Sequence, residues 1–296
     1  MANGEVGARR ELTPRKLTRR GFLKGALRSG IGLNALALGS VVYGETTEPD
    51  WLDVSRHTLR LPRLSSAFDG FTIAHFSDIH ADEWMTPRRL RHVVDTVNAQ
   101  KPDFIAITGD FVTHSPRFFA PGLIAELGRL HAKQGRGAVL GNHDHWTSAR
   151  FMREVIRDCG LLDLNNGVHT LRRGNQMLHL CGVDDPWAGK PRIDRVLDRL
   201  PIKGAAVLLA HEPDFADEYA RHGRFDLQLS GHSHGGQVRL PLCEPSRLPA
   251  FGQKYHTGLY QVGDMKLYTN RGVGTIGLRV RFNCRPEITM LTLCTV

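Results

Sequence analysis

The chain has 296 residues, of which 41% are hydrophobic and 23% charged, so it can bury a substantial core and is neither disordered nor fibrous. The formal net charge of +9 is uneven, because residues 1–44 contain eight Lys/Arg and two Asp/Glu whereas residues 45–296 contain 31 and 28, and we expect no specific nucleic-acid partner. The five cysteines are widely spaced without a CxxC pair, which excludes a zinc ribbon and a small disulfide scaffold.

The N-terminal segment predicts an export signal. Arg19 and Arg20 precede Gly-Phe-Leu-Lys, and a weakly apolar stretch follows from about residue 30 to residue 43. A basic region before a short apolar region is typical of secretory signals, and the paired arginines resemble a twin-arginine signal. We therefore divide the chain into a leader, residues 1–44, and a body, residues 45–296.

The leader carries expectations about partners and localisation. The twin-arginine translocation machinery is the expected partner, and the expected destination is the periplasm or the outer face of the cytoplasmic membrane. The apolar run is shorter than the ~20 residues of a spanning helix. An uncleaved leader would associate with the membrane surface, and a basic tail without a targeting role is the alternative.

The first half of the body predicts alternating strands and helices. The pattern predicts strands at residues 57–62, 71–76, 104–107 and 137–140, and helices at residues 87–100, 123–130 and 148–159. From residue 71 onward, each predicted strand ends in a polar cluster. These clusters contain Asp78 and His80, then Gly109 and Asp110, and then residues 142–144.

The second half continues the pattern with shorter strands. The sequence predicts strands at residues 168–171, 177–181, 205–210, 225–229, 237–240, 259–262, 265–269 and 288–293, and a helix at residues 193–200. One strand ends at His211 and the next runs into His232 and His234. Because alternate residues of an extended chain point the same way, these last two imidazoles are expected to face one point.

Five strands that end in Asp, Asn or His predict one common site, because ligands bind at the carboxyl ends of strands in α/β sheets. A nitrogen and oxygen ligand set without Cys suits Mn, Fe or Zn. There are more candidate ligands than one ion needs, which predicts two ions about 3.5–4 Å apart, bridged by a carboxylate. Such a pair binds phosphate oxygens and activates a bridging hydroxide for in-line attack on phosphorus.

The polar clusters form five ordered motifs that resemble those of the calcineurin-like metallophosphoesterases. They are DIH (78–80), GD (109–110), GNHD (141–144), AHEPD (210–214) and GHSHGG (231–236). With the leader, NRGVGT (270–275) and RPE (285–287), the chain is similar to the exported bacterial phosphodiesterases of that superfamily. The resemblance covers about residues 54–294 and implies an α/β fold, a four-layer sandwich of two mixed β-sheets flanked by helices.

The resemblance also implies a role for each motif residue. The first ion would be held by Asp78, His80, Asp110 and His234, and the second by Asp110, Asn142, His211 and His232, with Asp110 as the bridge. His143 would stabilise the phosphoryl oxygens or protonate the leaving group, and Asp144 would orient His143. The implied cofactors are two divalent metal ions, with Mn favoured over Fe, Zn, Ni and Co.

Further side chains near the motifs are candidates for substrate binding. His114 follows the Gly-Asp turn and His145 follows the GNHD motif, so both are candidates to reach the substrate. Arg271 is a candidate contact for an anionic substrate, with a role in holding a turn as the alternative. Trp84, Trp146 and Trp187 are candidates to line the pocket, with ordinary packing as the alternative.

The predicted function is hydrolysis of a phosphodiester substrate by a dimetal-dependent enzyme outside the cytoplasmic membrane. One alternative is a membrane-associated pyrophosphohydrolase of a UDP-sugar lipid intermediate, as in lipid A synthesis. The other is a non-catalytic metal-binding scaffold, against which all the ligand positions and the GNHD histidine are present.

Overall fold

The computed structural model describes residues 19–20, 34, 37–241, 243–245 and 248–296. The chain divides into two compact units, Met1–Val42 and Tyr43–Val296. In the first unit residues 37–42 are helical, and the Gly-Phe-Leu-Lys part of the expected export signal lies outside the described residues. No helix in the described part of the chain is both long enough and apolar enough to cross a bilayer.

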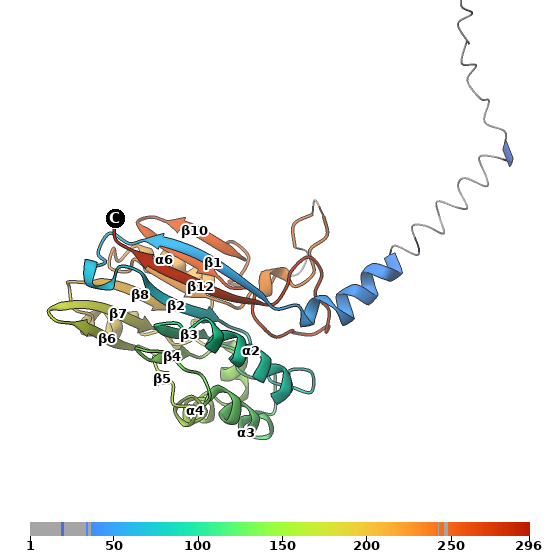
Figure 1. The fold of residues 1–296 in the computed structure, drawn as a ribbon, viewed down its shortest axis with the longest axis horizontal. Helices are drawn as coiled ribbons and strands as arrows, with labels where there is room; N and C mark the ends of the chain where they lie inside the picture. The colour runs from blue at the N-terminus through green and yellow to red at the C-terminus, as the bar shows by residue number, and fades with distance from the viewer. Residues whose placement is uncertain (1–18, 21–33, 35–36, 242, 246–247) are drawn as a thin grey trace, which may run out of the picture. The chain divides into compact units, whose positions relative to one another are not determined.

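The first β-sheet of the second unit has the strand order β1-β12-β2-β3-β4-β5 (Figure 1). Its strands are β1 (Asp53–Arg60), β12 (Glu287–Cys294), β2 (Phe71–Phe76), β3 (Phe104–Thr108), β4 (Arg136–Val139) and β5 (Leu162–Asp163). Strands β2 to β5 are parallel, whereas β12 runs antiparallel to β2, so the sheet is mixed. All five residues of β3 are buried, as expected for a continuous apolar strand covered on both faces.

The second β-sheet has the strand order β10-β11-β9-β8-β7-β6. Its strands are β10 (Gly258–Val262), β11 (Met265–Thr269), β9 (Leu227–Ser230), β8 (Ala205–Leu209), β7 (Gln176–Gly182) and β6 (Gly167–Arg173). The four central strands are parallel, and an antiparallel hairpin closes each edge. This sheet is mixed as well.

Helices cover the outer face of each sheet. Figure 1 shows α2 (Pro87–Ala99), α3 (Pro116–Leu127) and α4 (Asn142–Asp158) grouped against the first sheet. The short helices α5 (Ile193–Arg199) and α6 (Ala216–Ala220) cover the second. The described part of the second unit also contains four 3₁₀ turns, η1 (Glu48–Asp50), η2 (Ser66–Phe68), η3 (Pro213–Phe215) and η4 (His234–Gly236).

Three apolar cores hold these layers together. One lies between the first sheet and α2 to α4, and includes Val94 and Ile107. The second fills the space between the sheets, where Ile73 of β2 belongs to the same cluster as Val207 of β8. The third lies between the second sheet and α5 and α6. The expected four-layer sandwich of two mixed sheets flanked by helices is therefore confirmed.

Two helices begin earlier than the sequence predicted. Helix α4 begins at Asn142, directly after β4, and the predicted start at Ser148 is instead a kink with φ −171° and ψ 89°. Helix α3 begins at Pro116, because proline fits the first helical turn, and it continues through Pro121. The early start of α4 places the GNHD segment in the first turn of a helix.

The strand predicted at residues 237–240 is absent from this described segment. Val238 forms only an isolated bridge with Phe282. The preceding residues Gly235, Gly236 and Gln237 all have positive φ, so the chain turns sharply and cannot continue as a strand. This turn lies directly beside the candidate site.

Candidate metal centre

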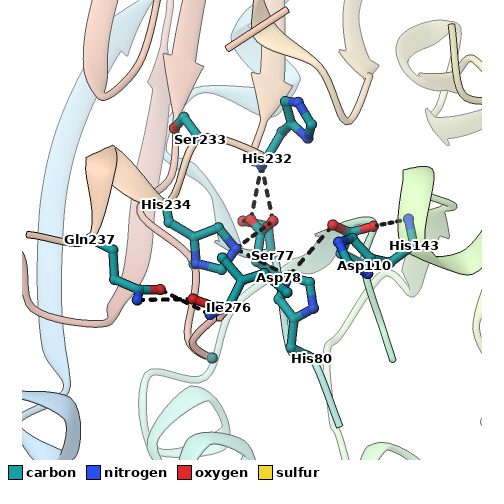
Figure 2. A network of polar contacts seen from close by, with 12 residues as sticks. Ser77, Asp78, His80, Asp110, His143, His232, Ser233, His234, Gln237 and Ile276 are labelled. Carbon is teal, nitrogen blue, oxygen red and sulfur yellow. Dashed lines mark hydrogen bonds and ion pairs between the residues drawn. The ribbon is translucent and has the colours of Figure 1, made fainter. Parts of the chain in front are cut away.

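The polar clusters follow strands that are neighbours in the two sheets. Strands β2, β3 and β4 are adjacent and parallel in the first sheet, and β8 and β9 are adjacent and parallel in the second. Their carboxyl ends therefore lie at common edges, and the loops after them carry the predicted ligands. Figure 2 shows side chains from both sheets pointing toward one another at this edge.

Five of the seven predicted ligands adopt a left-handed backbone conformation. Asp78, His80, Asp110, His232 and His234 have φ between 48° and 71°. Residues with a Cβ rarely adopt this backbone conformation, because it brings the Cβ close to the backbone. Backbone strain of this kind is typical of functional sites. The prediction that extended-chain alternation aims His232 and His234 is therefore wrong, since both lie in a tight turn instead.

The first side-chain cluster consists of Asp78, His80 and His234, whose candidate ligand atoms all lie within 4.8 Å of one another. The Nε2 atoms of His80 and His234 are 3.1 Å apart. The His234 Nε2 lies 3.4 Å from Asp78 Oδ1. Two imidazole nitrogens and a carboxylate oxygen thus face one point, as ligands of a divalent ion do.

The second cluster consists of Asp110, His211 and His232, again with candidate ligand atoms within 4.8 Å. The His211 Nε2 lies 3.2 Å from Asp110 Oδ2 and 3.2 Å from His232 Nδ1. The other ring nitrogens face carbonyls, with His211 Nδ1 2.7 Å from Thr108 O and His232 Nε2 2.8 Å from Ala250 O. When those nitrogens donate their protons to the carbonyls, the inward nitrogens keep lone pairs for a metal.

Asp110 connects the two clusters. Its Oδ2 lies 3.2 Å from His211 Nε2 in the second cluster and 3.5 Å from His80 Nε2 in the first. The adjacent Asn142 Oδ1 is buried without a hydrogen-bond partner among the described residues. A buried acceptor without a donor is costly, and a bound cation would satisfy it. The residues present therefore fit two divalent ions that share Asp110.

Glycines allow the backbone to approach these carboxylates. A Cβ on Gly141 would collide with Asp110 Oδ1, and a Cβ on Gly231 would collide with Asp78 Oδ2. Any larger residue at either position would displace a candidate ligand. This close approach explains glycine in the GNHD and GHSHGG motifs in physical terms.

Burial controls protonation in the site. It raises the pKa of Asp78 to about 6 and lowers the pKa of His80 and His232 to about 3, which keeps both imidazoles neutral as ligation requires. Burial opposes ionisation of both Asp110 and His211, yet Asp110 raises the pKa of His211 well above its usual value, and the charge and hydrogen bond of the protonated His211 hold the pKa of Asp110 well below its usual range. The bridging position is thus an anion. A bound metal would take the place of the His211 proton.

His143 lies at the edge of the clusters, in the first turn of α4. Its backbone N–H donates to Asp110 Oδ1 at 2.9 Å, and its Nδ1 lies 3.2 Å from the carbonyl of Thr113. Its ring contacts those of His80 and Trp146, with centroids 4.8 Å away in each case. The ring therefore lies beside the first cluster with Nδ1 held by the backbone.

Asp144 does not have the predicted role of orienting His143. Its two carboxylate oxygens accept the backbone N–H groups of Phe111 and Gly141, each at 3.0 Å. Burial and the nearby charge of Asp110 raise the pKa of Asp144 to about 7. Asp144 instead joins the loops after β3 and β4, and the partner of His143 Nδ1 in the described structure is the Thr113 carbonyl.

The three secondary candidates lie outside the cavity that contains the clusters. His114 is half exposed and its Nε2 is 3.5 Å from Glu83 Oε2. His145 Nε2 pairs with Asp184 Oδ1 at 2.7 Å. Arg271 forms ion pairs with Asp53 at 2.7 Å and Glu287 at 2.9 Å, which favours its alternative role of holding a turn.

The clusters open into a cavity of about 550 Å³. Trp146 and Trp187 line it as expected, whereas Trp84 lies elsewhere, beneath the guanidinium of Arg89. The sequence reasoning missed Gln237, Val238, Leu248, Ile276 and Leu278, which also line the cavity. They come from irregular loops, where residue type and spacing carry no signal for a pocket.

The chain matches the calcineurin-like phosphoesterase family over residues 71–236. It is 35% identical over 282 residues to the uncharacterized metallophosphoesterase YkuE of Bacillus subtilis (strain 168), with 94% of this chain and 98% of the relative covered. It is 32% identical over 259 residues to phosphodiesterase YaeI of Escherichia coli (strain K12), with 85% and 92% covered. Among solved structures, the sulfate thiohydrolase SoxB of Thermus thermophilus is 14% identical and covers 77% of this chain and 57% of its own, with a TM-score of 0.46.

These matches agree with the overlapping Asp/His groups at the strand ends, which are the two clusters and a third set of His80, Asp110 and His143 that lies between them. The chain belongs to the calcineurin-like metallophosphoesterases, a family of dimetal-dependent hydrolases that act on phosphoesters.

Proposed function

We propose that this protein is a dimetal-dependent phosphodiesterase. The observation that carries the proposal is the position of Asp110, whose Oδ2 lies within 3.5 Å of a histidine nitrogen in each cluster. A carboxylate shared in this way suits two ions held about 3.5–4 Å apart. Such an ion pair supplies Lewis-acid activation of the phosphoryl group and of the attacking water.

Two sets of residues that share Asp110 would hold the two ions. The first ion would be held by Asp78, His80, Asp110 and His234, and the second by Asp110, Asn142, His211 and His232. This nitrogen and oxygen donor set suits Mn, with Fe, Zn, Ni and Co as alternatives.

His143 would act on the substrate itself. With Nδ1 beside the carbonyl of Thr113, its second nitrogen is free to face the cavity that it lines. From there it would stabilise the phosphoryl oxygens or protonate the leaving oxygen. Both roles require a ring held by the backbone, which the Thr113 contact provides.

Preference for a diester has two supports. One is the name of the E. coli relative, a phosphodiesterase that is 32% identical. The other is the cavity of about 550 Å³, which extends beyond the clusters to Trp187 and Leu278 and offers room for a second organic group on phosphorus.

The test is hydrolysis of bis(p-nitrophenyl) phosphate by purified, metal-depleted protein titrated with Mn²⁺. We expect activity to appear on addition of Mn²⁺ and to exceed hydrolysis of p-nitrophenyl phosphate. Faster hydrolysis of the monoester would contradict the diesterase assignment, and full activity in the presence of chelator would contradict metal dependence.

We propose in addition that the protein is exported through the twin-arginine pathway. The support is the sequence of the leader, with paired arginines at residues 19 and 20 before an apolar stretch. Fractionation of cells expressing the wild type and the Arg19→Lys/Arg20→Lys double variant tests this. Export of both to the same extent would overturn the proposal, and retention of wild type on the membrane would indicate an uncleaved leader.

A further inference from the structure

Away from the candidate ligands and His143, the wall of the candidate cavity consists mainly of large apolar side chains. Trp146, Val238, Leu248 and Leu278 are among the residues that line it. Trp146 is 57% exposed and Leu278 is 66% exposed, so both offer apolar surface to solvent. Exposed apolar groups gathered beside a reaction site mark a place where a ligand binds.

This apolar wall is continuous with the candidate metal centre. The ring of Trp146 lies 4.8 Å from that of His143 and 5.3 Å from that of Trp187, measured between centroids. Trp187 in turn lies 5.5 Å from the ring of His232 and 5.7 Å from Phe251. A group attached to a phosphate at the clusters would therefore contact these tryptophans.

Gln237 is one of two polar side chains that line the cavity besides the candidate ligands and His143, as far as the structure describes the lining. Its Oε1 accepts the backbone N–H of Ile276 at 2.9 Å. Its Nε2 donates to the carbonyls of Ile276 at 3.2 Å and Leu278 at 2.7 Å (Figure 2 shows the pair with Ile276). The amide is thus used to hold the loop in place.

Ser233 is the other polar side chain, and it is also satisfied within the protein. Its hydroxyl donates to the carbonyl of His256 at 2.5 Å and accepts the backbone N–H of Gly235 at 3.2 Å. Away from the candidate ligands and His143, the described lining therefore presents apolar surface, on which Gln237 and Ser233 are already paired and the indole N–H groups of Trp146 and Trp187 are the remaining side-chain donors.

We propose that the substrate is a phosphodiester with an alkyl or acyl chain as one substituent, and that this chain binds along Trp146, Trp187 and Leu278. The proposal rests on the proposed phosphodiesterase function. An alkyl chain gains about 0.8 kcal/mol per buried methylene and leaves no polar group unpaired. A nucleoside would find no free carboxylate, amide or hydroxyl among the described side chains of this wall to recognise the edge of its base.

The test is a series of alkyl p-nitrophenyl phosphates with methyl, butyl and octyl chains, assayed with the Mn²⁺-loaded protein below micelle-forming concentrations. All three esters share one leaving group, so differences in kcat/KM between them report binding of the alkyl chain. We expect kcat/KM to rise about two- to fourfold per methylene until the wall is covered. Thymidine 5′-p-nitrophenyl phosphate should react more slowly than the octyl ester. A flat series, or preference for the thymidine ester, would overturn the proposal.

Substitutions in the apolar wall test where the alkyl chain of the substrate binds. Trp146→Ala and Leu278→Ala should each reduce the ratio of octyl to methyl kcat/KM at least about fourfold, the equivalent of one or more methylenes. Leu259→Ala is the matched control, because Leu259 is 46% exposed on β10 and does not line the cavity. An equal loss of the ratio in the control, or an unchanged ratio in both wall variants, would contradict the assignment.

A binding measurement tests the apolar subsite independently of the proposed phosphodiesterase function. Quenching of tryptophan fluorescence by the same esters, measured on the metal-depleted protein, gives their affinity without turnover. Absence of hydrolysis of every ester would end the phosphodiesterase proposal, while affinity that rises with chain length would still support the apolar subsite. Affinity independent of chain length would end the subsite proposal even for an active enzyme.

Discussion

Asp110 is the residue whose replacement should most weaken metal binding, because its carboxylate faces both clusters. The Asp110→Asn variant keeps the shape of the side chain but removes the charge that faces His80 and His211. Changes outside the ligand shell already reduce metal affinity about 10–100-fold, so we expect at least about 100-fold here. Elemental analysis should find fewer than two ions per chain. Asp264→Asn, at an exposed turn, is the control, and equal metal content in both variants would contradict the bridging role.

His143 should affect the reaction without affecting metal content. The His143→Ala variant should lose about 10²–10⁴-fold in kcat, the range of a general acid or base, while two ions remain bound. His131→Ala, at an exposed site, should behave as wild type. A His143→Ala variant with wild-type kcat, or one without metal, would contradict this assignment.

The choice of leaving group distinguishes the two roles left open for His143. A proton donor matters little for p-nitrophenolate, which leaves without protonation, and matters greatly for an alkoxide. Stabilisation of phosphoryl oxygens would matter equally for both. The ratio of the His143→Ala losses on the two ester types therefore assigns the role.

At the scale of elements, the buried Arg281 holds the loop that forms part of the cavity wall. Its side chain is fully buried, and its guanidinium donates to the carbonyls of Arg271, Gly272, Gly274 and Cys284 at 2.6–3.2 Å. This arrangement fixes the segment that carries Ile276 and Leu278. The guanidinium thus donates the hydrogen bonds that these backbone carbonyls would otherwise accept from a neighbouring strand or helix.

Replacement of Arg281 should destabilise the fold. Arg281→Met leaves several buried carbonyls without donors, and each unsatisfied group costs about 1–3 kcal/mol, so we expect a loss of at least about 3 kcal/mol in the free energy of unfolding. Urea denaturation measures it. The exposed Arg279→Met should change stability by less than about 1 kcal/mol, and similar values for the two variants would refute the account of this loop.

A second buried contact makes stability depend on pH. Although burial favours the neutral acid, the Arg271 guanidinium and hydrogen bonds from Ser55 and Tyr268 hold the pKa of Glu287 below its ordinary value of 4.5. A folded pKa below the unfolded one means that the carboxylate stabilises the fold above pH 4.5 and loses this effect as pH falls through the folded pKa.

The Glu287→Gln variant tests this linkage. At pH 7 we expect it to be about 3 kcal/mol less stable than wild type, because Arg271 loses its buried partner. The difference should shrink as pH falls below 4.5. Urea denaturation at several pH values measures the difference, and a difference that stays constant down to pH 3 would contradict the assignment.

At the scale of the whole molecule, the alternation of strands and helices predicted the individual elements of an α/β fold, whereas the four-layer arrangement of two mixed sheets followed from the resemblance to the metallophosphoesterases. Continuous apolar runs such as residues 104–107 and 205–210 became the buried strands β3 and β8 because the two faces of each sheet are covered. The start of α4 was missed because the GNHD segment is polar and lacks helical periodicity, although Asn142 begins the helix. Boundaries of this kind depend on backbone turns that tertiary contacts impose.

The candidate site was predicted in part. Residue type and position after a strand were enough to predict that these side chains converge on one site, whereas their division into two sets that share Asp110 followed from the family resemblance. Backbone conformation was not predictable, because the positive φ of His232 and His234 is held by contacts between distant loops. The apolar wall was also missed in part, since Leu278 and Gln237 meet only through the folded turn.

Anomalous diffraction from crystals of the Mn²⁺-loaded protein tests the central claim most directly. We predict two peaks about 3.5–4 Å apart, one on each side of Asp110. One peak should lie beside Asp78, His80 and His234, and the other beside Asn142, His211 and His232. A single peak, or two peaks of which neither contacts Asp110, would contradict the account.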